Sequence, residues 1–524
     1  MKMVKSLILG SAAGLVAMSG AQAADLPVKA KAVEYVRICS LYGAGFYYIP
    51  GTDTCIKIGG YVRAETAFNT NSTFNGAYNA GGGARNRYSN TYVTRARQDL
   101  NMDTRTATEY GVVRTFTDVV FTWTSGVYGA AAAPAGTAYA GDGIGGGTLG
   151  VYHAFIQFAG FTVGRTISIF DTPWTNYPGN NFDGLVGGSG DVTGVNQLTY
   201  TAALGNGVSL AVSAQESAAY YTTNIWNTSF GGVSAATPQT LPNPTPAATF
   251  ASTYGPTFAT GVYGTPSIAA QRLPDFVGQL RVDQAWGLFQ ASIASHHNHP
   301  TYYTATNEAS GHPDSKVGWA GQLALSIKNI PTGVGDSINI QGAYAVGASR
   351  YVFQSLVPTN WAMYGGSGAG GYQSLGLAGV SDAVFANGSQ LELTTSYGIR
   401  GAFNHNWDPY WTSSIYGAWA AMSYNTNAKA MICDRFAGAA PTLVPGAGFA
   451  CNPDFTVAQI GSRTAWTPVK NLTFSGDVVY THLDQKHSGL VTIPAVTAIG
   501  KPTAVYELRD QNTWTFLARA QRVF

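Results

Sequence analysis

Most of this chain consists of segments of roughly ten residues in which apolar and polar side chains alternate. In the segment 316–328, Leu323, Leu325 and Ile327 occupy odd positions. The polar residues Gln322, Ser326 and Lys328 occupy even positions. Because successive side chains of a β-strand point to opposite faces, each segment predicts a strand with one apolar and one polar face.

The number and spacing of these segments constrain the fold further. About sixteen can be counted, beginning near residues 57, 91, 111, 151, 161, 196, 208, 276, 288, 316, 337, 390, 410, 456, 472 and 504. Short turns (107–110, 205–207, 285–287, 331–335, 408–409 and 469–471) alternate with long links (69–90, 124–150, 170–195, 218–275, 299–315, 350–389, 425–455 and 485–503). An even strand number with short turns at one end and long loops at the other is typical of an outer-membrane barrel.

The predicted fold class is therefore all-β, with a sixteen-stranded antiparallel transmembrane β-barrel over residues 57–524. The short turns would be periplasmic and the long loops extracellular. A bilayer tolerates no free strand edge, so such a sheet must close. A soluble β-sandwich, with its apolar faces turned inward, is the alternative. The polar faces are rich in Arg, Gln, Asp and Thr, which suit a water-filled lumen better than a soluble surface of Lys and Glu.

The first 23 residues predict a secretory signal peptide (1–23) rather than part of the fold. Lys2 and Lys5 precede a short apolar run that ends in a small-residue cleavage site, Ala21-Gln22-Ala23. A transmembrane anchor is the alternative, but the apolar run is short for one. Cleavage would leave 27 basic residues, two fewer than the 29 of the whole chain, against 27 acidic ones. This balance is not typical of a nucleic-acid-binding protein, and no nucleic acid partner is expected.

An exported chain meets an oxidising compartment, where cysteines form disulfides. The chain has four, Cys39, Cys55, Cys433 and Cys451, which allow three pairings. We favour Cys39–Cys55, within an N-terminal segment 24–56, and Cys433–Cys451, each stabilising by roughly 3 kcal/mol in the chain-entropy model. Metal ligation is the alternative, but no pair has CxxC spacing.

Charged residues make up only 11% of the chain, against about 25% in ordinary soluble proteins. Yet five share odd parity in one predicted strand: Arg95, Arg97, Asp99, Asp103 and Arg105. Since a barrel strand turns its apolar face to lipid, this stripe is predicted to line the channel. Arg63 and Arg114 on the neighbouring strands are predicted to join it.

Three blocks, 36–65, 94–111 and 153–171, resemble the porins of alphaproteobacteria, a family found in rhizobia and brucellae. The resemblance implies a homotrimeric general diffusion porin, a passive water-filled channel for small hydrophilic solutes and ions across the outer membrane of a Gram-negative bacterium. The implied partners are outer-membrane lipid, lipopolysaccharide and the outer-membrane assembly machinery. Phe524, the last residue, would be the membrane-insertion signal.

In porins the third long loop typically folds into the barrel and narrows it. The resemblance assigns this role to residues 170–195, which carry Asp171, Asp183 and Asp191 but neither Lys nor Arg. An acidic loop opposite a wall of arginines would place a transverse field across the narrowest point. The alternative is that the arginines only pair with Asp99 and Asp103, without shaping conduction.

Other functional classes are less well supported. The chain has no GxSxG motif, and no enzymatic activity, catalytic residue or cofactor is expected. His296, His297 and His299 could bind a transition metal, but they begin a predicted external loop, and we expect no metal site. The main alternative is a substrate-specific channel with a binding site in its lumen. Most aromatic residues have lipid-side parity, which favours the general porin.

Overall fold

The computed structural model describes residues 37–69, 74, 85–87, 89, 91–124, 148–219, 223–229, 261–303, 308–368, 370–438, 443–496 and 500–524. The predicted signal peptide, 1–23, lies outside these residues. The chain divides into two compact units, Met1–Lys57 and Ile58–Phe524. Within the described ranges, no helix has both the length and the apolar character needed to cross a bilayer.

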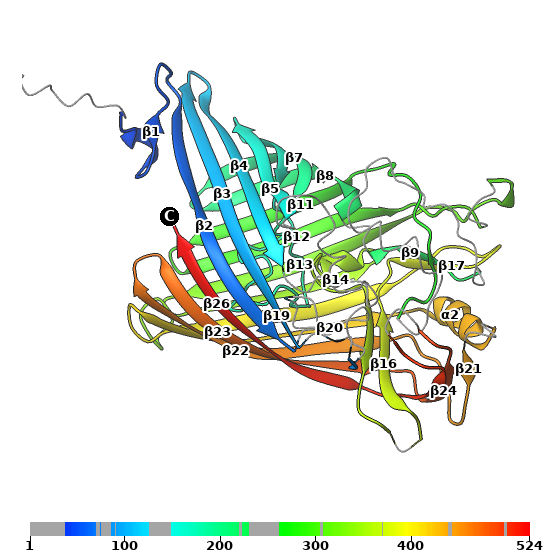
Figure 1. Cartoon of the computed structure of the whole chain (residues 1–524). Coiled ribbons are helices and arrows are strands. Elements are labelled where there is room, and N and C mark those ends of the chain that lie inside the picture. The colour runs from blue at the N-terminus through cyan, green and yellow to red at the C-terminus, as the bar shows by residue number, and fades with distance from the viewer. Residues whose placement is uncertain are drawn as a thin grey trace, which may run out of the picture. The chain divides into compact units, whose positions relative to one another are not determined.

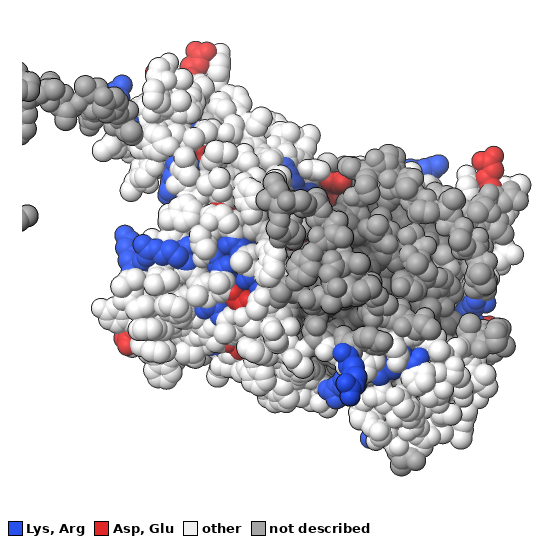
Figure 2. Space-filling model, viewed as in Figure 1, with Lys and Arg blue, Asp and Glu red and all other residues white. Residues whose placement is uncertain are grey.

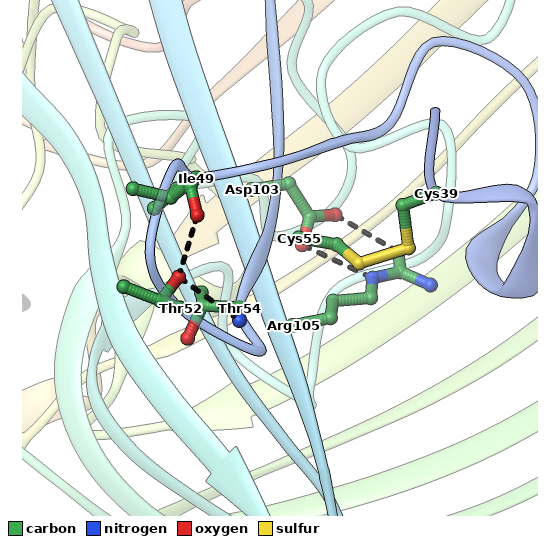
Figure 3. The surroundings of a disulfide bond; sticks show 7 residues. All are labelled: Cys39, Ile49, Thr52, Thr54, Cys55, Asp103 and Arg105. Atoms are coloured by element: carbon green, nitrogen blue, oxygen red, sulfur yellow. Dashed lines mark hydrogen bonds and ion pairs between the residues drawn. A yellow bond between two sulfur atoms is a disulfide. The ribbon is translucent and has the colours of Figure 1, made fainter. Parts of the chain in front are cut away.

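The first unit is organised around the disulfide between Cys39 and Cys55, which confirms the favoured pairing (Figure 3). Its short elements are η1 (Ser40–Tyr42) and β1 (Tyr47–Tyr48), and β1 pairs with the first residues of β2 (Cys55–Phe68). The intervening turn is closed by Thr52, whose hydroxyl donates to the Ile49 carbonyl (3.0 Å) and accepts from the Thr54 N–H (3.2 Å).

The second unit is a closed barrel of sixteen antiparallel strands. In Figure 1 the first strand, β2 in blue, runs beside the last, β26 in red, and their pairing from Tyr61↔Val523 to Phe68↔Phe516 closes the sheet. The remaining strands follow in chain order: β3 (Tyr92–Thr108), β4 (Gly111–Thr124), β5 (Thr148–Phe158), β6 (Phe161–Thr166), β7 (Val195–Gly205), β8 (Val208–Gln215), β11 (Asp275–Gln284), β12 (Gly287–Asn298), β13 (Lys316–Lys328), β14 (Ser337–Val346), β19 (Thr395–Asn406), β20 (Trp411–Ser423), β22 (Phe455–Val469), β23 (Leu472–Gln485) and β26 (Gln511–Val523).

The two faces of the barrel strands differ as the alternation predicts. On β13, Leu323 is 61% exposed, whereas its neighbour Gln322 is 3% exposed. The apolar side chains thus point outward, where lipid would cover them, and the polar ones point into the lumen. Figure 2 shows that most described residues on the face in view are uncharged.

Two predicted strand starts are wrong. The barrel strand predicted from residue 390 begins at Thr395, because Glu392–Leu393 is β18 and pairs with β17 (Ala383–Phe385). The segment expected to begin the last barrel strand, Ala504–Leu508, is instead β25, which pairs with β16 (Gln373–Gly379) and β24 (Gly489–Ile493) outside the barrel. The barrel strand begins at Gln511. Both segments alternate, and alternation is a local property that does not identify the partner strand.

The long links contain regular structure of their own. One small sheet is formed by β9 (Ile225–Asn227), β10 (Thr265–Pro266), β17 (Ala383–Phe385) and β18 (Glu392–Leu393). Another is formed by β15 (Asn360–Tyr364), β16, β21 (Val444–Pro445), β24 and β25. Short 3₁₀ turns are η3 (Ser217–Ala219), η7 (Glu308–Ser310) and η8 (Ser349–Tyr351). The helix α2 (Thr426–Gly438) is tied to the following loop by the Cys433–Cys451 disulfide, which confirms the second favoured pairing.

The buried apolar core is formed largely by link residues packed against the polar face of the barrel wall. Phe170, Phe182 and Val186, from the link between β6 and β7, are at most 1% exposed. They share one cluster with Phe353 and Trp361 from the link that follows β14. The inside of the barrel is therefore partly filled, and this filling positions the β6–β7 link.

Candidate functional site

The charged stripe on β3 faces the interior of the barrel. Arg95, Asp99 and Asp103 are each at most 7% exposed, whereas Met102, of the opposite parity, is 38% exposed. The structure thus places the predicted stripe on the lumen side of the wall, the only face of a transmembrane strand on which charges are readily tolerated.

Arg95 joins the wall to the β6–β7 link. Its Nε donates to the Glu65 carboxylate on β2, and its Nη1 donates to Oδ2 of Asp183 at 2.7 Å. The other Glu65 oxygen accepts from Nε of Arg519 on β26 at 2.7 Å. The guanidinium of Arg95 also lies 3.9 Å from the ring centre of Phe74. Arg95 and Glu65 together therefore join three barrel strands, β2, β3 and β26, to the link.

Asp103 holds two further arginines of the wall. Its carboxylate accepts from Arg105 at 2.9 and 3.1 Å (Figure 3) and from Nε of Arg114 on β4 at 3.1 Å. Arg114 also donates to Gln157 on β5 at 2.9 Å. These two arginines therefore share one carboxylate of the same wall.

Arg63 and Arg97 differ from their neighbours. Arg63 donates to Oε1 of Gln521 at 2.8 Å, and Arg97 donates to the Thr122 hydroxyl at 3.2 Å. No acidic oxygen of the described residues lies within 4.0 Å of either guanidinium. Asp99, on the same face, accepts from Asn101 at 3.2 Å. Arg63 and Arg97 thus leave positive charge on this part of the wall.

The link between β6 and β7, residues 167–194, is held against the lumen face of the opposite strands, and we call it the inner loop. Arg400 of β19, which is fully buried, donates to the carbonyls of Thr175 (2.6 Å), Leu185 (3.2 Å) and Ser189. Gln459 of β22 bonds the loop in both directions, since it accepts from the Val186 N–H (2.9 Å) and donates to the Gly184 carbonyl (3.3 Å). A buried loop carries backbone polar groups that must find partners, and here the wall side chains supply them.

One glycine allows the inner loop to lie directly on the strands. Gly187 has a φ of +86°, and a Cβ there would lie 2.3 Å from the Ile399 carbonyl oxygen. Its N–H donates to the Val352 carbonyl at 3.0 Å. Only glycine combines this backbone conformation with so close an approach to a neighbouring chain segment.

The three aspartates predicted for this loop occupy different environments. Asp183 contacts Arg95; burial opposes its ionisation, but the Arg95 guanidinium holds its pKa at about 2. Asp171 instead accepts from the Ser189 hydroxyl (2.5 Å) and the Asp191 N–H (2.7 Å), and burial raises its pKa to about 6. Asp191 accepts from the Thr193 hydroxyl at 2.7 Å. The structure therefore brings only Asp183 to the stripe, while the other two bond within the loop.

Several residues of this site were not among the predicted site residues. They are Glu65 and Arg519, which complete the Arg95 cluster, and Arg400, Gln341 and Gln459, which hold the loop. Each occupies a lumen-facing position of its strand, so parity indicates the face that it occupies. Parity does not indicate which lumen residue meets the inner loop, because that depends on the path of the loop.

Comparisons with known proteins identify the family. The model of the porin subfamily matches residues 25–517. The porin Omp2b of Brucella abortus is 38% identical over 223 residues, which cover 41% of this chain and 54% of that protein. The porin Omp2a of Brucella canis is 37% identical over 222 residues, which cover 41% of this chain and 56% of that protein. The chain thus spans about half the length of the curated relatives it matches.

A solved structure supports the fold alone. The outer membrane channel DcaP of Acinetobacter baumannii superposes with a TM-score of 0.53 at 15% identity, covering 91% of this chain and 99% of that one. The family match spans nearly the whole chain and agrees with the sixteen-stranded barrel. The chain therefore belongs to the porin family and is an outer-membrane β-barrel protein.

Proposed function

We propose that this protein is a general diffusion porin, a passive water-filled channel for small hydrophilic solutes and ions across the outer membrane. The observation that carries the proposal is the one-sided placement of the inner loop. It bonds lumen side chains from β11 round to β26, while Arg63, Arg97 and Arg114, on strands β2 to β4, remain half-buried. A lumen narrowed from one side and lined by partly hydrated charge on the other suits passage of small polar solutes.

The constriction of this channel lies, in our proposal, between the inner loop and the wall of β2, β3 and β4. The wall would be formed by Arg63, Arg95, Arg97, Asp99, Asp103, Arg105 and Arg114, and the loop side by Asp183. The contact of Asp183 with Arg95 supports this placement. Because Arg63 and Arg97 have no carboxylate at contact distance in the described structure, the local field would favour anions.

Family membership supports a homotrimer with lipid and lipopolysaccharide around its outer face. We assign Phe524 to recognition by the assembly machinery. Its ring is 55% exposed, although its N–H donates to the Gly60 carbonyl at 3.0 Å. Deleting Phe524 would lower the yield of folded barrel in the outer membrane, whereas refolding from urea into detergent would be unchanged.

Single-channel recording in a planar bilayer tests the channel function. Purified protein is expected to insert in three-step increments with ohmic conductance in KCl, and polyethylene glycols of increasing size would define the pore radius. With unequal salt on the two sides, the reversal potential is expected to show anion preference. Folded protein that inserts but does not conduct would overturn the proposal.

A further inference from the structure

The pairing of β4 with β5 contains a bulge that changes which side chains face the lumen. Asp118 pairs with His153 and Val119 pairs with Val151, so Tyr152 has no partner across the sheet. A β-bulge re-aims the side chain next to it. The Tyr152 ring lies 5.9 Å from the Arg97 guanidinium, and a Cβ on Gly150 would meet it at 3.0 Å. Tyr152 therefore lies on the lumen side, beside the stripe.

Tyr152 is one of several aromatic rings that lie beside lumen arginines. The Arg63 guanidinium lies 4.5 Å from the ring centre of Tyr61. The Arg114 guanidinium lies 5.2 Å from Phe116 and 5.4 Å from Phe155, and these two rings stack at 5.5 Å. The lumen face of β2 to β5 thus pairs guanidinium groups with aromatic rings.

The inner loop also carries two rings that are partly exposed. Between residues 171 and 190 of the inner loop, only Pro173, Trp174, Tyr177 and Asp183 are not buried. The Trp174 Nε1–H donates to Gln341 at 2.6 Å, and the Tyr177 hydroxyl donates to Asp183 at 2.9 Å. Hydrogen bonds therefore fix the polar edges of both rings, and the bond from Tyr177 to Asp183 places its ring beside the Arg95 contact.

A guanidinium stacked on a ring still presents its N–H edge to an anion. Arg63 and Arg97 each use one N–H on a neutral wall side chain, and neither contacts a carboxylate within the described ranges. A planar carboxylate would supply a negative charge at contact distance and accept two N–H bonds from one fork. A ring attached to that carboxylate would then lie against Tyr61 or Tyr152.

Resting on the diffusion function, we propose that this arginine and aromatic face is a binding subsite for small aromatic carboxylates, which the channel takes up in preference to aliphatic anions of the same size. Arg63 and Arg97 bind the carboxylate, and Tyr61 and Tyr152, with Tyr177 of the inner loop, contact the ring. The preference for an aromatic ring would come from the rings and the attraction for anions from the arginines, so the two can be separated by substitution.

The test compares two anions of similar size and equal charge, benzoate and cyclohexanecarboxylate, as blockers of KCl current at pH 7. Benzoate is expected to block at roughly 3- to 10-fold lower concentration, the range typical of an aromatic pair. Tyr152→Leu is expected to reduce this difference and Tyr152→Phe to keep it. Arg97→Gln is expected to weaken block by both anions alike.

Arg281→Gln is the matched control, because this arginine of β11 is paired with Asp283 at 2.8 Å. It is expected to retain the benzoate preference and the KCl conductance. A channel that conducts KCl but responds equally to both anions would overturn the subsite and leave the diffusion function intact. If folded protein does not conduct, the diffusion function fails, and NMR saturation transfer from detergent-solubilised protein to each anion decides on the subsite alone. A benzoate preference there supports it, and equal transfer overturns it.

Discussion

The Nη1 atom of Arg95 lies 2.7 Å from Oδ2 of Asp183, which ties the third-loop segment of this porin to the first strands of its barrel. The two ends of the inner loop bond the adjacent strands β6, β7 and β8, and most of its other anchors lie on strands far along the chain, from β11 to β26. The loop is therefore held mainly against the far strands, and the Arg95 contact joins it to the wall on the side of the proposed passage.

Asp183→Asn is expected to weaken this contact and widen the passage. The variant removes a charge-assisted bond, so a loss of about 1–3 kcal/mol in loop anchoring follows. Single-channel conductance should rise, and the reversal potential should shift further toward anions, since Arg95 would lose one of its two carboxylates. Unchanged conductance and selectivity would show that the contact does not limit the pore.

Arg400→Gln is expected to loosen the other side of the inner loop. It leaves carbonyls of Thr175, Leu185 and Ser189 without their buried donor, at a cost of about 1–3 kcal/mol for each unsatisfied group. We expect larger and noisier single-channel currents and faster proteolysis near 167–194. Arg281→Gln serves as the control, and equal noise in the two variants would argue against this role.

Arg63→Gln combined with Arg97→Gln is expected to reduce anion preference. Each substitution removes a positive charge that has no contacting carboxylate in the described structure, so the field at the wall weakens. The ratio of anion to cation permeability should fall several-fold in the double variant. Arg105→Gln should have a smaller effect, because the Asp103 carboxylate contacts this arginine and partly offsets its charge. The measurement is the reversal potential in a salt gradient.

The free energy of unfolding should depend on pH through the titration of Asp171. Burial raises its pKa from the ordinary 3.8 to about 6, so its contribution to stability is fully present below pH 3.8 and is lost as pH rises to about 6. The change is about 3 kcal/mol. Asp183 acts in the opposite sense and in a lower window, since the stability it contributes is lost only as pH falls from 3.8 to about 2.

Denaturant unfolding of detergent-solubilised protein between pH 4 and pH 8 measures this effect. The difference in free energy of unfolding between the wild type and Asp171→Asn isolates the single group. Between pH 4 and pH 6 the wild type should lose stability relative to the variant. Above pH 6 the difference in free energy of unfolding should stay constant. A constant difference across the range would rule out titration of Asp171.

Removing the Cys433–Cys451 bond should destabilise the link between β20 and β22 and leave the barrel stable. The bond closes a loop with a sequence separation of 18, worth about 3 kcal/mol. In the Cys433→Ser, Cys451→Ser variant, proteases should cut between 426 and 454 sooner than in the wild type. In detergent gels, the variant should keep the mobility of the folded barrel up to the same temperature as the wild type. Loss of that mobility at a lower temperature would show that the disulfide also stabilises the barrel.

The sequence by itself determined the barrel and the face that each charge occupies. Alternation is a local property with a period of two residues, so the lumen parity of Arg95, Arg97 and Asp103 could be read directly. The cysteine spacing favoured the pairings that the structure confirms, although it did not exclude the others.

Only the tertiary structure decided how lumen residues meet. The alternation at 504–508 belongs to a strand of an external sheet, because the pattern does not identify its partner. The bulge opposite Asp118 and Val119 places Tyr152 beside Arg97, since one extra residue changes the parity of the strand. Asp183 reaches Arg95 whereas Asp171 and Asp191 bond within the loop, because the path of the loop depends on contacts with strands more than 100 residues away, such as Gln279 and Arg400.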